Sequence, residues 1–309
     1  MKLAFLYAGQ GSQRCGMGKD FYAEYPQIRP LFDMPAMNLD LRSLCFEAPM
    51  ETLSQTQYTQ PCMAVFAAAV TRLLNEAGIR PDFAAGLSLG EYGALHAAGA
   101  FDAKTLVELL AFRGKVMAET TQGMDCGMTA VFGLDEAAVR EAVSSAGSGA
   151  FCCNLNCPGQ IVIGGVRDAV EAAAKTCLDR GAKHCITLNV SGPFHTPLME
   201  QASLLLEQKL KHIPFAPLDC PVFSNVTGET IPQDADIEKL LVQQIKMPVR
   251  FDRILKNLAD CDVDAVIEIG PGKVLSGFLH KTAPHIRRYA IETVEDFQRT
   301  VEDLKQQEG

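Results

Sequence analysis

The sequence lacks the features that mark several classes of protein. No Cys-x-x-Cys pair occurs, and the eleven cysteines are scattered, with a local group only at Cys152, Cys153 and Cys157. A zinc site needs ligands at a spacing that allows tetrahedral coordination, and none is visible. We therefore expect no metal site, and reduced thiols that serve as small apolar side chains.

Long apolar runs and a positive net charge are also missing. The longest apolar candidate, residues 64–69, is soon broken by Arg72, whereas a membrane span needs about 18 residues. The opening residues 1–7 are too short for the core of a signal peptide and fit a buried strand better. With 28 basic and 37 acidic residues, the net charge of −9 disfavours phosphate backbones. We expect a cytoplasmic protein whose main partner is neither a membrane nor nucleic acid.

What the chain does contain is enough apolar sequence for a sizeable core. Hydrophobic residues make up 48% of the 309 positions. Runs typical of buried strands alternate with helical patterns, which predicts an α/β fold. The expected strands are 3–7, 82–88, 128–133, 150–154, 160–164, 185–190, 221–226 and 265–269, and the expected helices are 61–77, 90–98, 102–119, 135–146, 168–180 and 273–280.

The middle of the chain has its own order of elements. Residues 126–192 are predicted to run strand–helix–strand–strand–helix–strand, the order of a ferredoxin-like unit. Gly123, Gly127 and Gly192 are suited to be the hinges where this segment leaves and rejoins the main domain. We predict a small ferredoxin-like subdomain over 126–192. It would interrupt a large α/β-hydrolase-like domain with a parallel central sheet, formed by residues 1–125 and 193–309.

The segment Gly86-Leu87-Ser88-Leu89-Gly90 fits the pattern G-x-S-x-G between a predicted strand and a predicted helix. In such a nucleophile elbow the serine lies in a strained turn with its hydroxyl exposed, and the glycines avoid clashes. The backbone N–H of Leu89, at the helix N-terminus, is suited to stabilise an oxyanion. Ser88 is therefore a candidate nucleophile, with a merely structural tight turn as the alternative.

A serine nucleophile needs a base, and His195 is the best of the six histidines. His96 follows Ser88 on the same helix by eight residues, about 12 Å along the axis, and cannot reach the hydroxyl. His195 lies between Pro193 and Pro197, which fix the backbone of its loop. The alternative is a solvated loop histidine. The other histidines fit an edge strand or the surface: His184, His212, His280 and His285.

Arg113 falls on the apolar stripe of the helix that begins at Asp102, three residues from both Leu110 and Val116. An inward-facing guanidinium needs an anion, because an unpaired buried charge is very costly. The anion is either an internal carboxylate or the carboxylate of a substrate. In the second case the substrate is an acyl group that carries a free acid.

The loop Gly9-Gln10-Gly11-Ser12-Gln13 follows the first predicted strand at its carboxyl end, where α/β sheets bind ligands. It lacks the lysine of the P-loop and the third glycine of the dinucleotide fingerprint, so nucleotide binding is not expected. Beside a serine elbow, this loop is suited to supply a second oxyanion donor.

Together these motifs resemble the malonyl-CoA:acyl carrier protein transacylases and, more distantly, the acyltransferase domains of polyketide and fatty acid synthases. The resemblance covers essentially the whole chain. It rests on the sequences GQGSQ at 9–13, GLSLG with Glu91-Tyr92 after it, Arg113-Gly114, N-x-N-x-P-G-Q at 154–160, GPFH at 192–195, SNVTG at 224–228, Gln244 four residues before Pro248, and EIGPG at 268–272.

The resemblance implies transfer of a malonyl group from malonyl-CoA to the phosphopantetheine thiol of acyl carrier protein, for fatty acid biosynthesis and without a cofactor. Ser88 would carry the acyl group as an ester, and His195 would act as general base and then acid. A main-chain carbonyl near Gln244 would orient the imidazole in place of a triad aspartate.

The same resemblance implies the substrate contacts. The backbone N–H groups of Gln10 and Leu89 would form the oxyanion hole, and Arg113 would hold the malonyl carboxylate. Phe194 would crowd an α-methyl group, so methylmalonyl would be disfavoured.

Two positions depart from the family pattern. Leu87 stands where the family usually has histidine, so any role of that imidazole in binding or leaving-group protonation is absent or replaced. Ala8 stands where the loop usually begins with proline, which would cost only some loop rigidity. Neither change removes a group that the expected chemistry requires.

Other functions stay open at this point. A serine thioesterase or acyl-CoA hydrolase would share Ser88 and His195, and an acid such as Asp125, Asp168 or Asp179 would serve the histidine. A malonyl loader for a polyketide synthase and a catalytically inactive carrier-binding scaffold are further alternatives. Because carrier proteins are generally acidic, a local basic patch is expected, with candidates Arg250, Arg253, Lys273, Lys281, Arg287 and Arg288.

Overall fold

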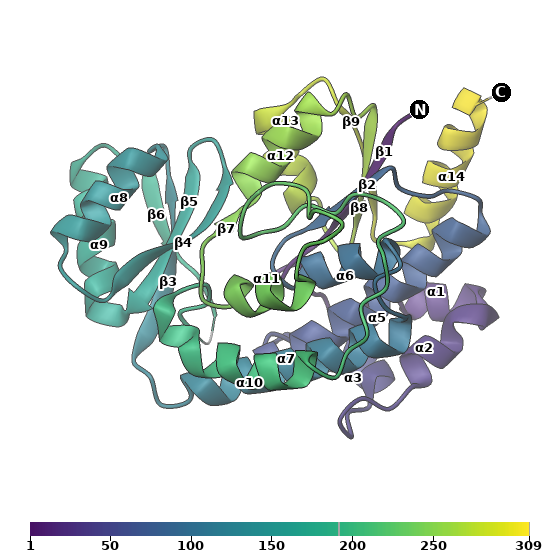
Figure 1. The fold of residues 1–309 in the computed structure, drawn as a ribbon, viewed down its shortest axis with the longest axis horizontal. Helices are drawn as coiled ribbons and strands as arrows, with labels where there is room; N and C mark the ends of the chain where they lie inside the picture. Colours follow the sequence, from purple (N-terminus) through teal and green to yellow (C-terminus); the bar gives the residue numbers. More distant parts are fainter. Residues whose placement is uncertain (191, 309) are drawn as a thin grey trace.

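The computed structural model describes residues 1–190 and 192–308, and these form a mixed α/β fold with two sheets (Figure 1). Ser191 and Gly309, which fall in the predicted segments 126–192 and 193–309, lie outside the described residues. The first sheet is parallel, in the order β2-β1-β8-β9. Its strands are β1 (Leu3–Tyr7), β2 (Phe83–Gly86), β8 (Ala265–Ile269) and β9 (Arg287–Ile291).

The two faces of the parallel sheet bury alternate residues of the same strands, as strand geometry requires. Phe5 and Ile267 belong to the core formed with helices α5 (Thr56–Glu76), α6 (Leu89–Ala97) and α7 (Ala103–Thr121). Leu6 and Val266 belong to the opposite core, formed with α12 (Phe251–Asp260) and α13 (Val274–Thr282). Strands covered on both faces read as continuous apolar runs, which is why β1, β2 and β8 were predicted. The edge strand β9, which begins with Arg287 and Arg288 and is only partly buried, was not foreseen.

The remaining helices surround this domain. They are α1 (Lys19–Glu24), α2 (Arg29–Asp33), α3 (Leu41–Glu47), α4 (Met50–Leu53), α10 (Glu200–Leu210), α11 (Ile237–Gln244) and α14 (Val294–Glu308), with short 3-10 turns η1 (Pro26–Ile28) and η2 (Pro197–Met199). Figure 1 shows α10 below the centre of the view, beside α7 and α11, against which it packs.

The second sheet, in the order β6-β3-β5-β4-β7, is mixed. The predicted strand–helix–strand–strand–helix–strand order is confirmed by β3 (Cys126–Phe132), α8 (Glu136–Ser145), β4 (Ala150–Cys157), β5 (Gln160–Val166), α9 (Arg167–Asp179) and β6 (His184–Thr187). The two helices share a separate core with these strands. One strand of this second sheet was not foreseen: β7 (Val249–Arg250), from the later part of the chain, pairs in parallel with β4.

Two predicted elements differ most from the structure. The helix expected from Pro61 begins at Thr56, so Pro61 lies inside the helix and not at its start. The stretch 221–226 is not a strand. It makes only single bridges, such as Val222 with Ala84, before its chain turns away.

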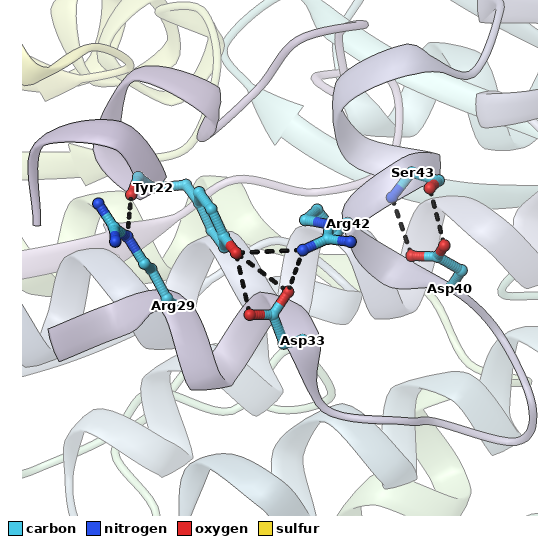
Figure 2. Close-up of polar contacts among 6 residues, drawn as sticks. All are labelled: Tyr22, Arg29, Asp33, Asp40, Arg42 and Ser43. Carbon is cyan, nitrogen blue, oxygen red and sulfur yellow. Dashed lines mark hydrogen bonds and ion pairs between the residues drawn. The ribbon is translucent and has the colours of Figure 1, made fainter. Parts of the chain in front are cut away.

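An exposed polar cluster ties the N-terminal helices together (Figure 2). Arg42 Nη1 donates to Asp33 Oδ1 at 2.9 Å, and the hydroxyl of Tyr22 donates to the same carboxylate. Asp40 caps α3 by accepting the N–H of Ser43. Such exposed pairs contribute little to stability, so this corner relies on the apolar rings beneath it.

The composition raised three questions, about free cysteines, metal ligands and membrane-spanning helices. All eleven cysteines are free. No group of three or more His, Cys, Asp or Glu side chains lies close enough to hold a metal ion in residues 1–190 and 192–308. In the part of the chain that the structure describes, none of the helices combines the length and hydropathy needed to cross a membrane.

Candidate active site

Ser88 lies in the turn between β2 and α6, with φ 55° and ψ −107°. The flanking glycines are required by close approach rather than by their own dihedral angles. A Cβ on Gly86 would lie 2.1 Å from the carbonyl of Gly90, and one on Gly90 would lie 2.1 Å from the carbonyl oxygen of Tyr7. The turn therefore has the geometry of a nucleophile elbow, in which a partly exposed hydroxyl is presented on a strained backbone.

The side chain of Asn225 braces this strained turn from both sides. Its Oδ1 accepts the N–H of Ser88 at 2.7 Å, and its Nδ2 donates to the carbonyl of Gly86 at 2.7 Å. Asn225 is fully buried, and its hydrogen bond to Gly86 is shielded from water. The sequence motif SNVTG contained this residue without indicating its contact with the elbow.

His195 meets Ser88 at hydrogen-bonding distance, with Nε2 2.8 Å from Oγ. Its Nδ1 lies 2.7 Å from the main-chain carbonyl of Gln244. Because a carbonyl only accepts, Nδ1 carries the proton, and Nε2 of the neutral ring is free to accept one from the hydroxyl. The imidazole is 4% exposed, so the alternative of a solvated loop histidine is wrong.

The environment keeps His195 neutral. Burial and the neighbouring charge of Arg113 lower its pKa to about 3, and the hydrogen bond to Gln244 opposes this only in part. A neutral imidazole at physiological pH is the form that accepts a proton. The hydrolase alternative expected an acid such as Asp125 to serve the histidine. Asp125 is paired with Arg167 at the surface, and Nδ1 of His195 is bonded to a main-chain carbonyl rather than to a carboxylate.

Arg113 projects from α7 and is 1% exposed. Its guanidinium donates to Gln60 Oε1 at 2.8 Å, to Gln244 Oε1 at 2.9 Å and to Ser88 Oγ at 3.2 Å. It also lies over the ring of Tyr92 at 5.4 Å. Among the described residues it forms no ion pair with a carboxylate, so the expectation of a direct internal salt bridge is wrong. Two amide oxygens hold this cation beside the serine, and the charge of Glu91 acts on it without a direct ion pair.

Ser88, His195 and Arg113 line one cavity of about 270 Å³. Its wall includes Gln10 and Phe194, two of the residues predicted for substrate contact. Further wall residues come from the turns after β1 and β2, from α5 and α7, from the second sheet with the segment after β6, and from α13, among them Gln60, Leu87, Met117, Asn156, Gln160, Leu188 and Phe278. The site therefore lies between the carboxyl ends of β1 and β2 and the second sheet, and its wall combines apolar side chains with polar ones.

The loop 9–13 is packed against the elbow, since a Cβ on Gly9 would lie 2.7 Å from the carbonyl oxygen of Leu87. Leu89 is the first residue of α6, where backbone N–H groups have no partner within the helix. Leu87 lines the cavity as an apolar side chain. The N–H of Ala8 donates to Ile269 at 3.0 Å, a bond that a proline at this position would lack.

Two of the six basic candidates have balanced charges. Arg250 is paired with Glu136, and Arg253 with Glu229. Lys281 Nζ donates to Oε1 of Gln160, a residue of the cavity wall, at 3.3 Å. The other candidates are Lys273, Arg287 and Arg288, and the docking patch as a whole stays a prediction.

A family model described as an acyl transferase domain matches residues 4–307. The chain belongs to the acyl transferase family. Among the relatives of this acyl transferase is the malonyl CoA-acyl carrier protein transacylase of Bacillus subtilis, 40% identical over 311 residues that cover 99% of this chain and 98% of the relative.

Solved structures of related acyl transferases have the same fold. The malonyl CoA-acyl carrier protein transacylase of Clostridium perfringens is 36% identical, with a TM-score of 0.95 over 100% of this chain and 98% of that one. A second structure is a type II polyketide synthase acyl-carrier protein in complex with its malonyl-transacylase. It matches at 34% identity with a TM-score of 0.93, over 98% of this chain and 100% of that one.

Some residues at the centre of this acyl transferase were missed by sequence reasoning. Gln60 and Asn225 were not singled out, although a polar residue on the apolar face of a long helix was a usable signal for Gln60. Gln244 was predicted for its carbonyl, yet its side chain also contacts Arg113 and the carbonyl of Ser88. Only the fold brings these amides together.

Proposed function

We propose that this acyl transferase moves a malonyl group from malonyl-CoA to the phosphopantetheine thiol of acyl carrier protein, and so supplies extender units for fatty acid biosynthesis. One observation carries the proposal: a hydrogen-bonded Ser88–His195 pair shares a cavity with a buried guanidinium that has no carboxylate partner among the described residues. The names of the relatives support the same activity.

The first half-reaction loads the enzyme. His195 Nε2 accepts the proton of Ser88 as Oγ attacks the thioester carbonyl, and a tetrahedral intermediate forms. The N–H groups of Gln10 and Leu89 stabilise its oxyanion. When the intermediate collapses, the C–S bond breaks and the coenzyme A sulfur leaves as a thiol with the proton from His195.

The second half-reaction reverses these roles. The phosphopantetheine thiol gives its proton to His195 and attacks the carbonyl of the malonyl ester. The ester C–O bond breaks, and Ser88 recovers its proton. Each step uses groups of this chain and the two substrates, so the proposed reaction needs no cofactor.

Arg113 selects the acyl group. The substrate carboxylate binds beside the guanidinium, which has no carboxylate at ion-pair distance among the described residues, and the resulting ion pair holds the ester and helps to exclude water. Phe194, at the cavity wall, crowds a substituent on the α-carbon. We expect malonyl to be accepted and methylmalonyl to be disfavoured.

The finer architecture and the location belong to the same proposal. We interpret residues 126–192 as a ferredoxin-like subdomain, supported by the strand order β6-β3-β5-β4, inserted into a hydrolase-like domain of residues 1–125 and 193–309. We propose that the enzyme acts in the cytoplasm. We propose no role in binding nucleic acid or a membrane.

A malonyl loader for a polyketide synthase is the second candidate, favoured by the similarity to the transacylase that was solved with a polyketide carrier protein. It would use the same residues and differ only in the carrier. Comparing the rates with carrier proteins of the two pathways distinguishes these functions.

The decisive test incubates the enzyme with malonyl-CoA and phosphopantetheinylated carrier protein. Malonyl-carrier is expected as the main product. Free malonate as the main product would identify a hydrolase instead, and no turnover of malonyl-CoA would favour the inactive scaffold. Ser88→Ala serves as the control for uncatalysed exchange.

A further inference from the structure

Glu91 is a fully buried carboxylate that the proposed mechanism does not use. It lies in the first turn of α6, three residues after Ser88. Its Oε2 accepts a hydrogen bond from Gln244 Nε2 at 2.5 Å, while its Oε1 has no hydrogen-bond partner. A buried carboxylate is costly to keep, so its position beside the reacting groups calls for a role.

Gln244 connects Glu91 to the substrate-binding cation. Its Nε2 donates both to Glu91 and to the carbonyl of Ser88, the latter at 2.8 Å. Its Oε1 accepts from Arg113 at 2.9 Å. Its main-chain carbonyl orients His195. One glutamine therefore contacts the nucleophile's backbone, the base and the cation.

The direction of the Gln244 amide decides whether Arg113 is held. With Oε1 toward the guanidinium, the Gln244 amide accepts a hydrogen bond from Arg113. If the amide were rotated by about 180°, its N–H groups would face a cation that only donates, and this hydrogen bond would be lost. An ionised Glu91 only accepts, so it stabilises the first orientation and opposes the second. A neutral group at position 91 that both donates and accepts would tolerate either.

The charges around Glu91 are few. Burial raises the pKa of Glu91 to about 7, whereas the hydrogen bond from Gln244, the nearby polar groups of Asn225 and Ser224 and the charge of Arg113 act to lower it. The charged or titratable groups that act on it are Arg113 from α7 and Tyr92 from α6 itself. The neighbouring α11 and the 224–225 segment face it with the uncharged Gln244, Ser224 and Asn225.

We propose that Glu91 is a positioning residue, whose carboxylate fixes the side chain of Gln244 and thereby holds Arg113 ready for the carboxylate of the acyl substrate. This inference rests on the proposed function, because it assigns Glu91 to the selection of acidic acyl groups. It predicts that loss of the charge on Glu91 weakens malonyl loading specifically.

The first test is Glu91→Gln, which keeps the size and a hydrogen-bonding amide but removes the charge. Acyl-enzyme formation is measured with malonyl-CoA and, in parallel, with acetyl-CoA. We expect kcat/KM for malonyl-CoA to fall about tenfold, mainly through KM, as for other residues that orient a ligand-holding group. The value for acetyl-CoA should stay within about twofold, and Glu91→Asp should restore part of the malonyl activity.

Glu268→Gln is the matched control. Glu268 is also fully buried, but it accepts the N–H groups of Leu275 and Ser276 at the start of α13. This variant should lower stability without changing the ratio of malonyl to acetyl loading. An unchanged ratio in Glu91→Gln, whether both activities fall or neither does, would overturn the proposal.

The second test needs no variant and applies even where Glu91→Gln does not fold. In the wild-type enzyme the ratio of malonyl to acetyl kcat/KM should rise as the pH increases through about 7, where Glu91 ionises. A ratio that is flat from pH 6 to 8 would contradict the role of Glu91. Failure of the wild type to form any malonyl-enzyme would instead refute the proposed function itself.

Discussion

Ser88 and His195 lie 107 positions apart in the chain, yet their Oγ and Nε2 atoms are 2.8 Å apart and both residues have positive φ, 55° and 62°. Such dihedrals are costly for residues with a Cβ. Contacts from a third part of the chain hold them, since Asn225 accepts the N–H of Ser88 and Ile245 accepts that of His195. Tertiary contacts therefore hold both residues of the pair in strained backbone conformations.

The strain at position 88 predicts that glycine is more stable there than alanine, although both substitutions abolish activity. Ser88→Ala and Ser88→Gly should both fail to form an acyl-enzyme. Ser88→Gly should be more stable than Ser88→Ala by about 1 kcal/mol, because glycine adopts this backbone without a Cβ penalty. Urea denaturation of the two variants measures the difference. Equal stabilities would mean that the elbow is not strained.

Removal of the brace should loosen the nucleophile. Asn225→Ala leaves the N–H of Ser88 and the carbonyl of Gly86 buried without partners, which should lower the free energy of unfolding by about 2 kcal/mol. Malonyl loading should fall about tenfold or more, since Oγ is no longer fixed. Thr227→Ala, at an exposed site of the same loop, is the control and should change little.

Arg113 should matter for the acid group of the substrate more than for the thioester. Arg113→Ala should reduce malonyl loading about 100-fold, through the lost charge-assisted hydrogen bonds, and acetyl loading much less. Arg113→Lys should be intermediate, because a lysine keeps the charge but lacks the fork. Kinetics with both thioesters measure this. Equal losses for the two substrates would make Arg113 a structural residue.

His195 should make stability depend on pH in a defined direction. Its pKa is about 3 in the folded protein and near the ordinary histidine value of 6.5 in the unfolded chain, so between these values the unfolded chain binds a proton that the folded protein does not. This residue therefore lowers stability as the pH falls from about 6.5 toward 3. His195→Gln should lose stability less steeply there, by up to about 1.4 kcal/mol per pH unit. Parallel denaturation slopes for the two proteins would contradict the low pKa.

The sequence was sufficient for local geometry. The G-x-S-x-G pattern located the elbow, and the asparagine-and-aspartate capping rule placed the start of α7 at Asp102, whose side chain accepts the N–H of Thr105. Arg113 on an apolar stripe correctly indicated an inward-facing cation. These features depend on residues three or four positions apart in the chain, so a local sequence pattern is enough to predict them.

Long-range amide contacts were beyond such reasoning. Residues 221–226 have the composition of a strand, but the chain leaves the ladder after Phe223, and Asn225 turns to brace Ser88 instead. Gln60 and Gln244 converge on Arg113 from helices 53 and 131 positions away. No local pattern encodes which glutamine among several will face a buried cation.

The most direct measurement is the intact mass of the enzyme after brief mixing with malonyl-CoA, followed by peptide mapping of the adduct. The account predicts one malonyl group, on the peptide that contains Ser88, and its disappearance when phosphopantetheinylated carrier protein is added. No adduct on the wild type, or an adduct that persists in Ser88→Ala, would contradict it.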